Sequence, residues 1–127
     1  GDEITISVGG KVDTVYNAPF IFTGIIASKQ ETSYGKTVIL KHDGVNLILS
    51  ELPMALKEPS DFRDLGLSVW KADIVAVKNL FPFRYHYLLY NRKTINVMSP
   101  GFSSIDPFAL KYVNIPRPIY PLDKIDS

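Results

Sequence analysis

The dipeptide Asp43-Gly44 constrains the fold of this chain most, because it separates two apolar runs of similar length. The runs are Thr37–His42 and Val45–Ser50, and both are rich in β-branched and aliphatic residues. Both central residues of a type I′ turn need positive φ, which aspartate and glycine tolerate better than bulky residues. The pattern therefore predicts a β-hairpin with its turn at these two residues.

Both faces of the predicted hairpin are apolar. Side chains alternate between the two faces of a strand, so Val38 and Leu40 would point to one side and Ile39 and Ile48 to the other. We therefore expect this part of the sheet to be covered on both sides.

Two more strands are expected in the N-terminal half. Residues 4–8 alternate apolar and polar side chains, which is typical of a half-buried strand. Residues 20–27 are β-branched and aromatic, which favours a second strand. Gly24 within it indicates a bulge or close packing.

A short helix, Asp61–Leu65, is expected after the hairpin. Ser60 is a suitable N-cap, Asp61 favours the first turn, and Gly66 is suited to the C′ position that ends a helix.

The sequence pattern of residues 73–101 predicts a strand–helix–strand unit. Residues 74–77 and 94–98 are apolar runs expected as strands, and the aromatic residues 82–90 between them show helical spacing. A crossover of this length favours parallel strands, and a hairpin-like antiparallel arrangement is the open alternative. The predicted fold class is thus mixed α/β (α+β): a β-rich N-terminal half with a hairpin, this unit, and an extended Pro-rich tail.

The parallel arrangement would bring four polar residues together. Lys78 and Asn79 would follow the carboxyl end of the first strand, and Ser99 would follow the carboxyl end of the second. Arg84 would lie in the connecting helix. Ligands of open α/β sheets bind at this edge, so these residues are candidates for an anion, substrate or partner site. The alternative is that Lys78 and Arg84 are ordinary surface cations.

The tail is expected to contain little regular structure. Asp106 could cap a short helix over residues 107–112. Residues 115–123 contain three prolines, which exclude a regular hydrogen-bonded element. We expect this segment to be extended and to pack its apolar side chains against the domain, and the alternative is a polyproline II ligand. These side chains are Ile119, Tyr120 and Leu122.

Length and composition narrow the class of protein. A chain of 127 residues with a net charge of +1 and scattered basic residues predicts one domain, 1–127, without a nucleic-acid partner. The absence of cysteine excludes disulfides and thiolate metal sites within it. No apolar run approaches the roughly 20 residues of a membrane span, so we expect a soluble, cytoplasmic domain without a membrane partner. Because the chain begins with Gly1 and not Met, we expect a piece of a larger protein.

Motifs that carry chemistry are not evident. The two histidines, His42 and His86, fall in separate predicted elements without the paired spacing of a zinc site. The sequence has neither a phosphate-binding glycine loop nor a nucleophile elbow. We therefore expect no catalytic residues, metal ligands or cofactor in this chain alone.

Five short segments nevertheless occur in a characteristic order. They are Val8–Asp13 (VGGKVD), Gly35–Leu40 (GKTVIL), Val75–Asn79 (VAVKN) with Phe83-Arg84, Ser99–Asp106 (SPGFSSID) and Arg117–Asp123 (RPIYPLD). This series resembles the C-terminal region of microcystinase C-like (MlrC-type) metallopeptidases and covers almost the whole chain.

The resemblance implies that the parent protein is a bacterial, zinc-dependent hydrolase that cleaves amide bonds of small or linear peptides. It places the zinc ligands in the parent's N-terminal catalytic domain, which would be the partner of this chain. The chain would then complete or cover the cleft without being catalytic, with Lys78, Asn79, Arg84 and Ser99 facing it.

Two positions depart from the family pattern. Asn79 stands where the family usually has serine, and Pro82 stands where a histidine often precedes Phe-Arg. The alternative function is therefore a non-catalytic interaction or oligomerisation module that keeps the fold, and a homo-oligomer is left open.

Overall fold

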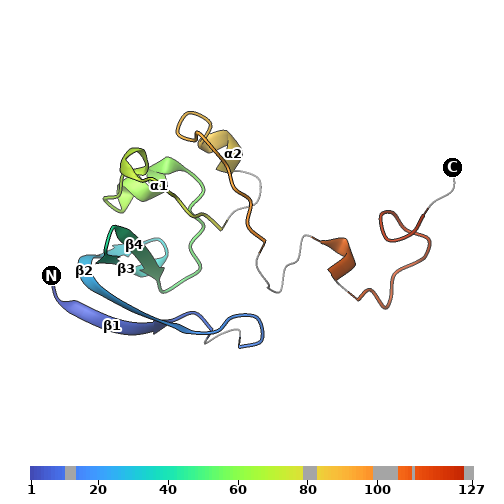
Figure 1. Ribbon diagram of the computed structural model, residues 1–127, viewed down its shortest axis with the longest axis horizontal. Helices are drawn as coiled ribbons and strands as arrows, with labels where there is room; N and C mark the ends of the chain where they lie inside the picture. The colour runs from blue at the N-terminus through green and yellow to red at the C-terminus, as the bar shows by residue number, and fades with distance from the viewer. Residues whose placement is uncertain (11–13, 79–82, 99–105, 110, 125–127) are drawn as a thin grey trace. The chain divides into compact units, whose positions relative to one another are not determined.

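The computed structural model describes residues 1–10, 14–78, 83–98, 106–109 and 111–124 (Figure 1). The chain forms two compact units, Gly1–Ile6 with Phe22–Asn96 and Ser7–Ile21 with Val97–Ser127. The described elements are β1 (Glu3–Val8), β2 (Phe20–Thr32), β3 (Gly35–His42), β4 (Val45–Ser50), α1 (Pro59–Asp64), the 3₁₀ helix η1 (Val69–Lys71), α2 (Phe83–His86) and the 3₁₀ helix η2 (Pro107–Ala109). This content confirms a mixed α+β fold in which strands dominate.

The four strands form one sheet in the order β1-β2-β3-β4, and β3 pairs antiparallel with β2 and with β4. The predicted hairpin is β3–β4, with His42 paired to Val45 beside the turn. Asp43 has φ of 42° and Gly44 has φ of 82°, so both turn residues have the positive φ that their types predict.

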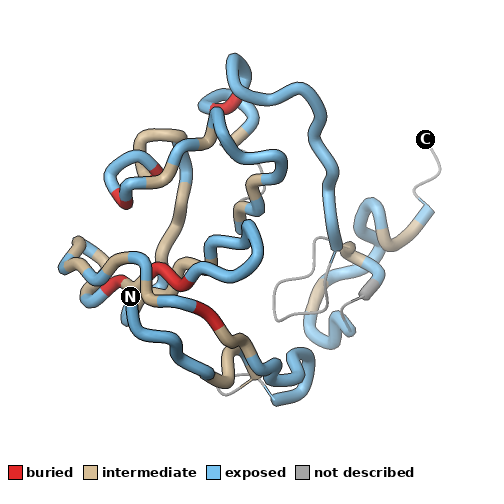
Figure 2. The backbone as a smooth tube through the Cα atoms, turned by 60° about the vertical axis from the view of Figure 1, so that its left-hand side comes forward, coloured by how far each residue is buried: buried red, intermediate tan, exposed pale blue. Residues whose placement is uncertain are grey.

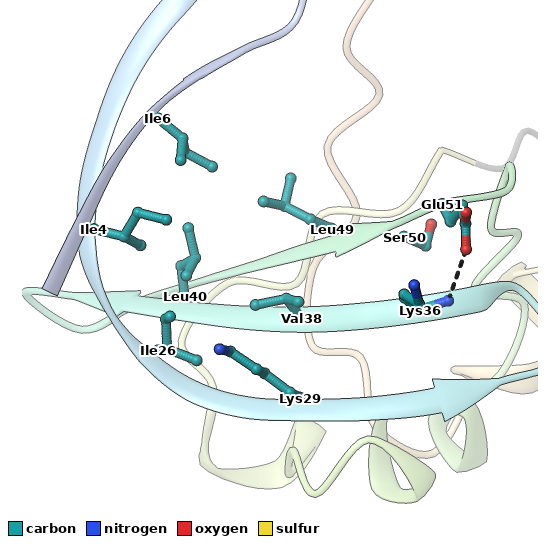
Figure 3. Close-up of a pocket in the computed structure, with 10 residues that line it drawn as sticks. All are labelled: Ile4, Ile6, Ile26, Lys29, Lys36, Val38, Leu40, Leu49, Ser50 and Glu51. Atoms are coloured by element: carbon teal, nitrogen blue, oxygen red, sulfur yellow. Dashed lines mark hydrogen bonds between the residues drawn. The ribbon is translucent and has the colours of Figure 1, made fainter. Parts of the chain in front are cut away.

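Both faces of the sheet are covered at its centre, as expected. Ile39 and Leu40 are neighbours in β3 and therefore point to opposite faces, yet each is only 2% exposed. Figures 1 and 3 place α1 on the side of β3 that is opposite to β1. The core of this unit therefore extends to both sides of β3.

Of the two alternatives expected for Gly24 in β2, the structure shows close packing, and a β-bulge lies three residues further along the strand. Gly24 is closely packed, since a Cβ there would lie 2.9 Å from the carbonyl oxygen of Lys41. The register also shifts between Ile26 and Ser28, where Ala27 is an extra residue in the pairing with β3. This β-bulge changes which side chains of β2 share a face.

Helix α1 begins earlier than predicted. Its N-cap is Glu58 and not Ser60, because Pro59 occupies the first helical turn, where its missing N–H costs no hydrogen bond. The Asp61 carboxylate accepts the backbone N–H of Lys57 at 2.6 Å and that of Glu58 at 3.0 Å. Asp61 thus satisfies two donors at the start of the helix.

The end of α1 agrees with the prediction. Gly66 follows the helix with φ of 78°, the left-handed conformation expected at C′. Its N–H donates to the carbonyl of Arg63, and the N–H of Leu67 donates to that of Phe62, each at 2.8 Å. The two bonds form a Schellman motif.

The predicted strand–helix–strand unit is wrong in its strands and in the length of its helix. Residues 74–77 and the described residues 94–98 form no strand, and the helix that the structure describes in this region is α2, Phe83–His86, which ends before residues 87–90. An apolar run becomes a strand only when a neighbouring strand pairs with it, and Ile74 is 87% exposed. Aromatic residues also have modest helix propensity, and short helices are marginal without packing.

The tail also differs from the prediction. Asp106 accepts the N–H of Phe108 at 2.9 Å, which confirms its capping role, but the helix that follows is the 3₁₀ turn η2. Residues 115–123 form neither helix nor strand, as the prolines predict, yet they close into a turn instead of remaining extended. Tyr120 is 79% exposed, so its expected packing is wrong.

Candidate functional site

The structure describes two of the four predicted site residues. Lys78 lies in an irregular segment and Arg84 lies in α2, and both are exposed. Neither forms an ion pair with the residues that the structure describes. Asn79 and Ser99 lie outside the described residues, so the predicted four-residue group stays a prediction.

A second polar group surrounds the start of α1 and the end of α2. Nδ1 of His86 lies 3.5 Å from Oε2 of Glu58, which precedes α1. Tyr87 follows α2 directly and is only 5% exposed. Its hydroxyl is buried without a hydrogen-bond partner among the described residues. We call Glu58, Asp61, His86 and Tyr87 the α1–α2 cluster.

The α1–α2 cluster disfavours a negative charge on the tyrosine. Burial raises the pKa of Tyr87 to about 12, and the nearby carboxylates of Asp61 and Glu58 act in the same direction. The phenol therefore stays neutral at physiological pH. Its position explains the local fold, since the aromatic ring anchors the end of α2 beside α1.

The described residues between Ile74 and Ile95, which are 74–78 and 83–95, are mostly exposed and include several large apolar side chains; Figure 2 draws exposed residues in pale blue. We call these described residues the exposed apolar segment. Its most exposed large apolar side chains are Ile74 (87%), Tyr85 (85%), Leu89 (83%), Leu88 (76%) and Ile95 (73%). Large exposed apolar surfaces mark interaction sites in soluble proteins.

An aromatic pair adjoins this segment. The rings of Trp70 and Tyr90 lie 4.6 Å apart at an interplanar angle of 42°. Tyr90 belongs to the segment, whereas Trp70 lies in η1 and is itself 70% exposed. The pair therefore links the end of the exposed apolar segment to η1.

The first three strands and the inner face of β4 enclose a groove of about 460 Å³, the sheet groove (Figure 3). Its walls are mostly aliphatic. They consist of Ile4, Ile6, Ile26, Val38, Leu40 and Leu49, with Lys29, Lys36, Ser50 and Glu51 as the polar lining residues. This groove was not predicted from the sequence. The signal was present, because residues two positions apart in a strand share a face, as Val38 and Leu40 do in β3 and Ile4 and Ile6 do in β1.

The tail holds a separate polar contact. Nη2 of Arg117 lies 2.7 Å from Oδ1 of Asp123, and Oδ2 of the same aspartate accepts the N–H of Ile119 at 2.8 Å. The loop between them presents Tyr120 to the surroundings. Both oxygens of the Asp123 carboxylate therefore have partners within the loop.

Within the described ranges, no group of three or more His, Asp or Glu side chains could hold a metal ion. His42 lies beside the turn, with Nε2 3.5 Å from Oδ2 of Asp43, and its ring contacts Phe22 edge-on. No helix in the described part of the chain has the length and apolarity needed to cross a membrane.

Comparison with known protein families gives a match. The family model described as "MlrC C-terminus" matches residues 1–114 of this chain. Neither the curated proteins nor the solved structures contain a significant match to it.

Proposed function

Because this chain belongs to the MlrC C-terminal family, we propose that it is an accessory domain of an MlrC-like zinc hydrolase. The parent would cleave amide bonds of small or linear peptides, with zinc and its ligands in the N-terminal catalytic domain. This chain would complete or cover the cleft and would not be catalytic alone.

The exposed apolar segment is the observation that carries the proposal. Ile74, Leu88 and Leu89 are each more than three-quarters exposed. Burying a Leu or Ile side chain contributes about 1.5 to 3 kcal/mol, so covering the three would stabilise an interface substantially. A partner domain is the covering surface that a C-terminal domain of a larger protein would meet first.

Lys78 and Arg84 belong to the same segment and would lie at the border of that interface. Both are exposed cations without an ion-pair partner in the part of the chain that the structure describes. An arginine can bind a carboxylate through two parallel hydrogen bonds, and a lysine offers a compact positive charge. We infer that these side chains attract the carboxylate of a peptide substrate to the cleft, with Asn79 and Ser99 as further cleft-facing candidates.

The proposal is tested on the full-length parent. Leu88→Asp and Leu89→Asp should weaken domain association and lower kcat/KM, because a charge in an apolar interface is costly. Leu52→Asp is the matched control, since Leu52 is 54% exposed and lies outside the segment. Equal effects from all three variants would contradict an interface at residues 74–95.

The proposed role of Lys78 and Arg84 is tested by separate substitutions. Lys78→Ala and Arg84→Ala should each lower kcat/KM about fivefold, the loss expected for one charge-assisted contact. Arg63→Ala is the control, because the side chain of Arg63 is 78% exposed in α1. Unchanged hydrolysis in both test variants would remove Lys78 and Arg84 from the cleft.

The alternative is an interaction or oligomerisation module, and the same segment favours it because two copies could bury it mutually. Sedimentation of the 127-residue chain separates the two functions. A stable dimer that Leu88→Asp dissociates, together with a parent that lacks zinc and hydrolyses no peptide, would favour the module.

A further inference from the structure

The sheet groove combines apolar walls with the charged side chains of Lys29, Lys36 and Glu51. Six aliphatic side chains from all four strands line it, and Figure 3 shows them directed toward a common space. The volume of about 460 Å³ lies within the range of small-molecule sites. A groove of this kind favours a ligand with an aliphatic body.

The bulge in β2 places Lys29 in this groove. Ile26 and Lys29 are three residues apart and would face opposite sides of a regular strand. Because Ala27 is an extra residue, Ile26 pairs with Leu40 and Lys29 pairs with Val38, so both face the groove. Figure 3 shows the ammonium end of Lys29 extending toward Ile26 and Leu40.

The two lysines of the groove have different surroundings. Lys36 lies beside Glu51, whose carboxylate accepts the Lys36 backbone N–H at 3.3 Å. The ammonium groups of Lys29 and Lys36 form no ion pair with any residue that the structure describes, but only Lys36 has a carboxylate of the groove beside it. Covering the groove with a purely apolar body would therefore desolvate an unpaired ammonium, which is unfavourable. An occupant that brings its own anionic group would avoid this cost.

We propose that the sheet groove binds an aliphatic carboxylate. The hydrocarbon chain lies along the six aliphatic side chains, and the carboxylate meets the ammonium of Lys29. This site is independent of the proposed cleft function, because none of its lining residues belongs to the exposed apolar segment.

Methyl NMR titration of the 127-residue chain tests the site. Decanoate, kept below its aggregation concentration, should shift the methyl signals of Ile4, Ile6 and Ile26. Decanol, with the same chain and no charge, should bind about threefold to fivefold more weakly, as expected for one partly exposed ion pair. Equal binding of both compounds, or shifts confined to residues 74–95, would overturn the proposal.

Two lysine variants form a matched pair. Lys29→Gln should weaken decanoate binding about threefold to fivefold. Lys36→Gln should change it less than twofold, because Lys36 lies at the end of the groove beside Glu51, whose carboxylate would repel that of the ligand. Equal losses in both variants would contradict the specific role of Lys29. Circular dichroism of each variant confirms that the sheet is retained.

Charge reversal gives a gain of function that a merely unfolded variant could not show. Lys29→Glu should reject decanoate and bind decylammonium more tightly than the unmodified chain does. Failure of this exchange in a folded variant would overturn the proposal. A different result would show that the groove is a domain interface and would overturn the proposal. In that case the rest of the full-length parent would cover the groove, and neither the parent nor the 127-residue chain would bind decanoate.

Discussion

Arg117 and Asp123, the first and last residues of the RPIYPLD segment, form an ion pair with 2.7 Å between Nη2 and Oδ1. Asp123 also exchanges hydrogen bonds with Ile119, since its Oδ2 accepts the Ile119 N–H and its own N–H donates to the Ile119 carbonyl at 2.9 Å. One aspartate therefore closes the loop through both its side chain and its backbone.

We expect Asp123→Ala to open this loop with little effect on overall stability. The ion pair is partly exposed, so its loss should cost less than about 1 kcal/mol. The amide of Ile119 should exchange faster with solvent, as NMR hydrogen exchange would measure. Lys124→Ala is the control and should leave that exchange rate unchanged. Unaltered protection of Ile119 in Asp123→Ala would contradict the closing role of the carboxylate.

Tyr87 should make the free energy of unfolding depend on alkaline pH. Its pKa in the folded chain is about 12, whereas the ordinary value is 10.0. The folded state therefore holds the phenol proton more tightly, and this contribution is complete below pH 10. It should fall by roughly 1.4 kcal/mol per pH unit between pH 10 and 12.

Tyr87→Phe separates this effect from other titrations. The hydroxyl has no hydrogen-bond partner among the described residues, so its removal should leave stability at pH 7 unchanged or slightly higher. Urea unfolding at pH 7 and 11 would show a smaller decline than in the unmodified chain. A loss above about 2 kcal/mol at pH 7 would mean that the hydroxyl has a stabilising partner.

Asp61 should contribute more to the stability of α1 than the neighbouring Asp64. Asp61→Ala removes the acceptor for the N–H groups of Lys57 and Glu58 and should cost about 1 kcal/mol. Asp64 lies 3.8 Å from Arg63 at an exposed position, so Asp64→Ala should change stability by less than about 0.5 kcal/mol. Thermal unfolding measures both, and equal losses would argue against a capping role for Asp61.

Gly66→Ala should be destabilising for a backbone reason alone. Nothing lies within 4 Å of the Cβ that alanine would add, but φ at this position is 78°. The left-handed conformation should cost about 1 kcal/mol with alanine and less with asparagine. Urea unfolding would reveal this order, and an alanine variant as stable as the asparagine variant would contradict it.

Local chemistry made the hairpin and the end of α1 predictable. Asp43, Gly44 and Gly66 adopt the positive φ that their residue types favour, and neither feature depends on distant partners. Residues 74–77 have equally suitable side chains for a strand, but no strand pairs with them. The residues of an apolar run do not indicate which other segment, if any, will pair with it as a strand.

The candidate sites were less predictable because they depend on contacts between elements. Of the predicted cleft-facing residues, Lys78 and Arg84 are exposed, and their role stays a prediction. The contact of His86 with Glu58 joins residues far apart in the chain, and no sequence motif indicates it. The sheet groove depends on a register shift within β2, which changes the face of every following side chain.

That register shift makes the chemistry of the groove sensitive to residue count as well as residue identity. If the extra residue of β2 lay after Lys29 and not at Ala27, Ser28 would pair with Val38 and Lys29 would turn to the opposite face. A compensated insertion and deletion a few residues apart could thus exchange an ammonium for a hydroxyl in the groove while the neighbouring strands kept their sequences. Length changes within β2 are therefore a route by which relatives of this chain could acquire different ligand preferences.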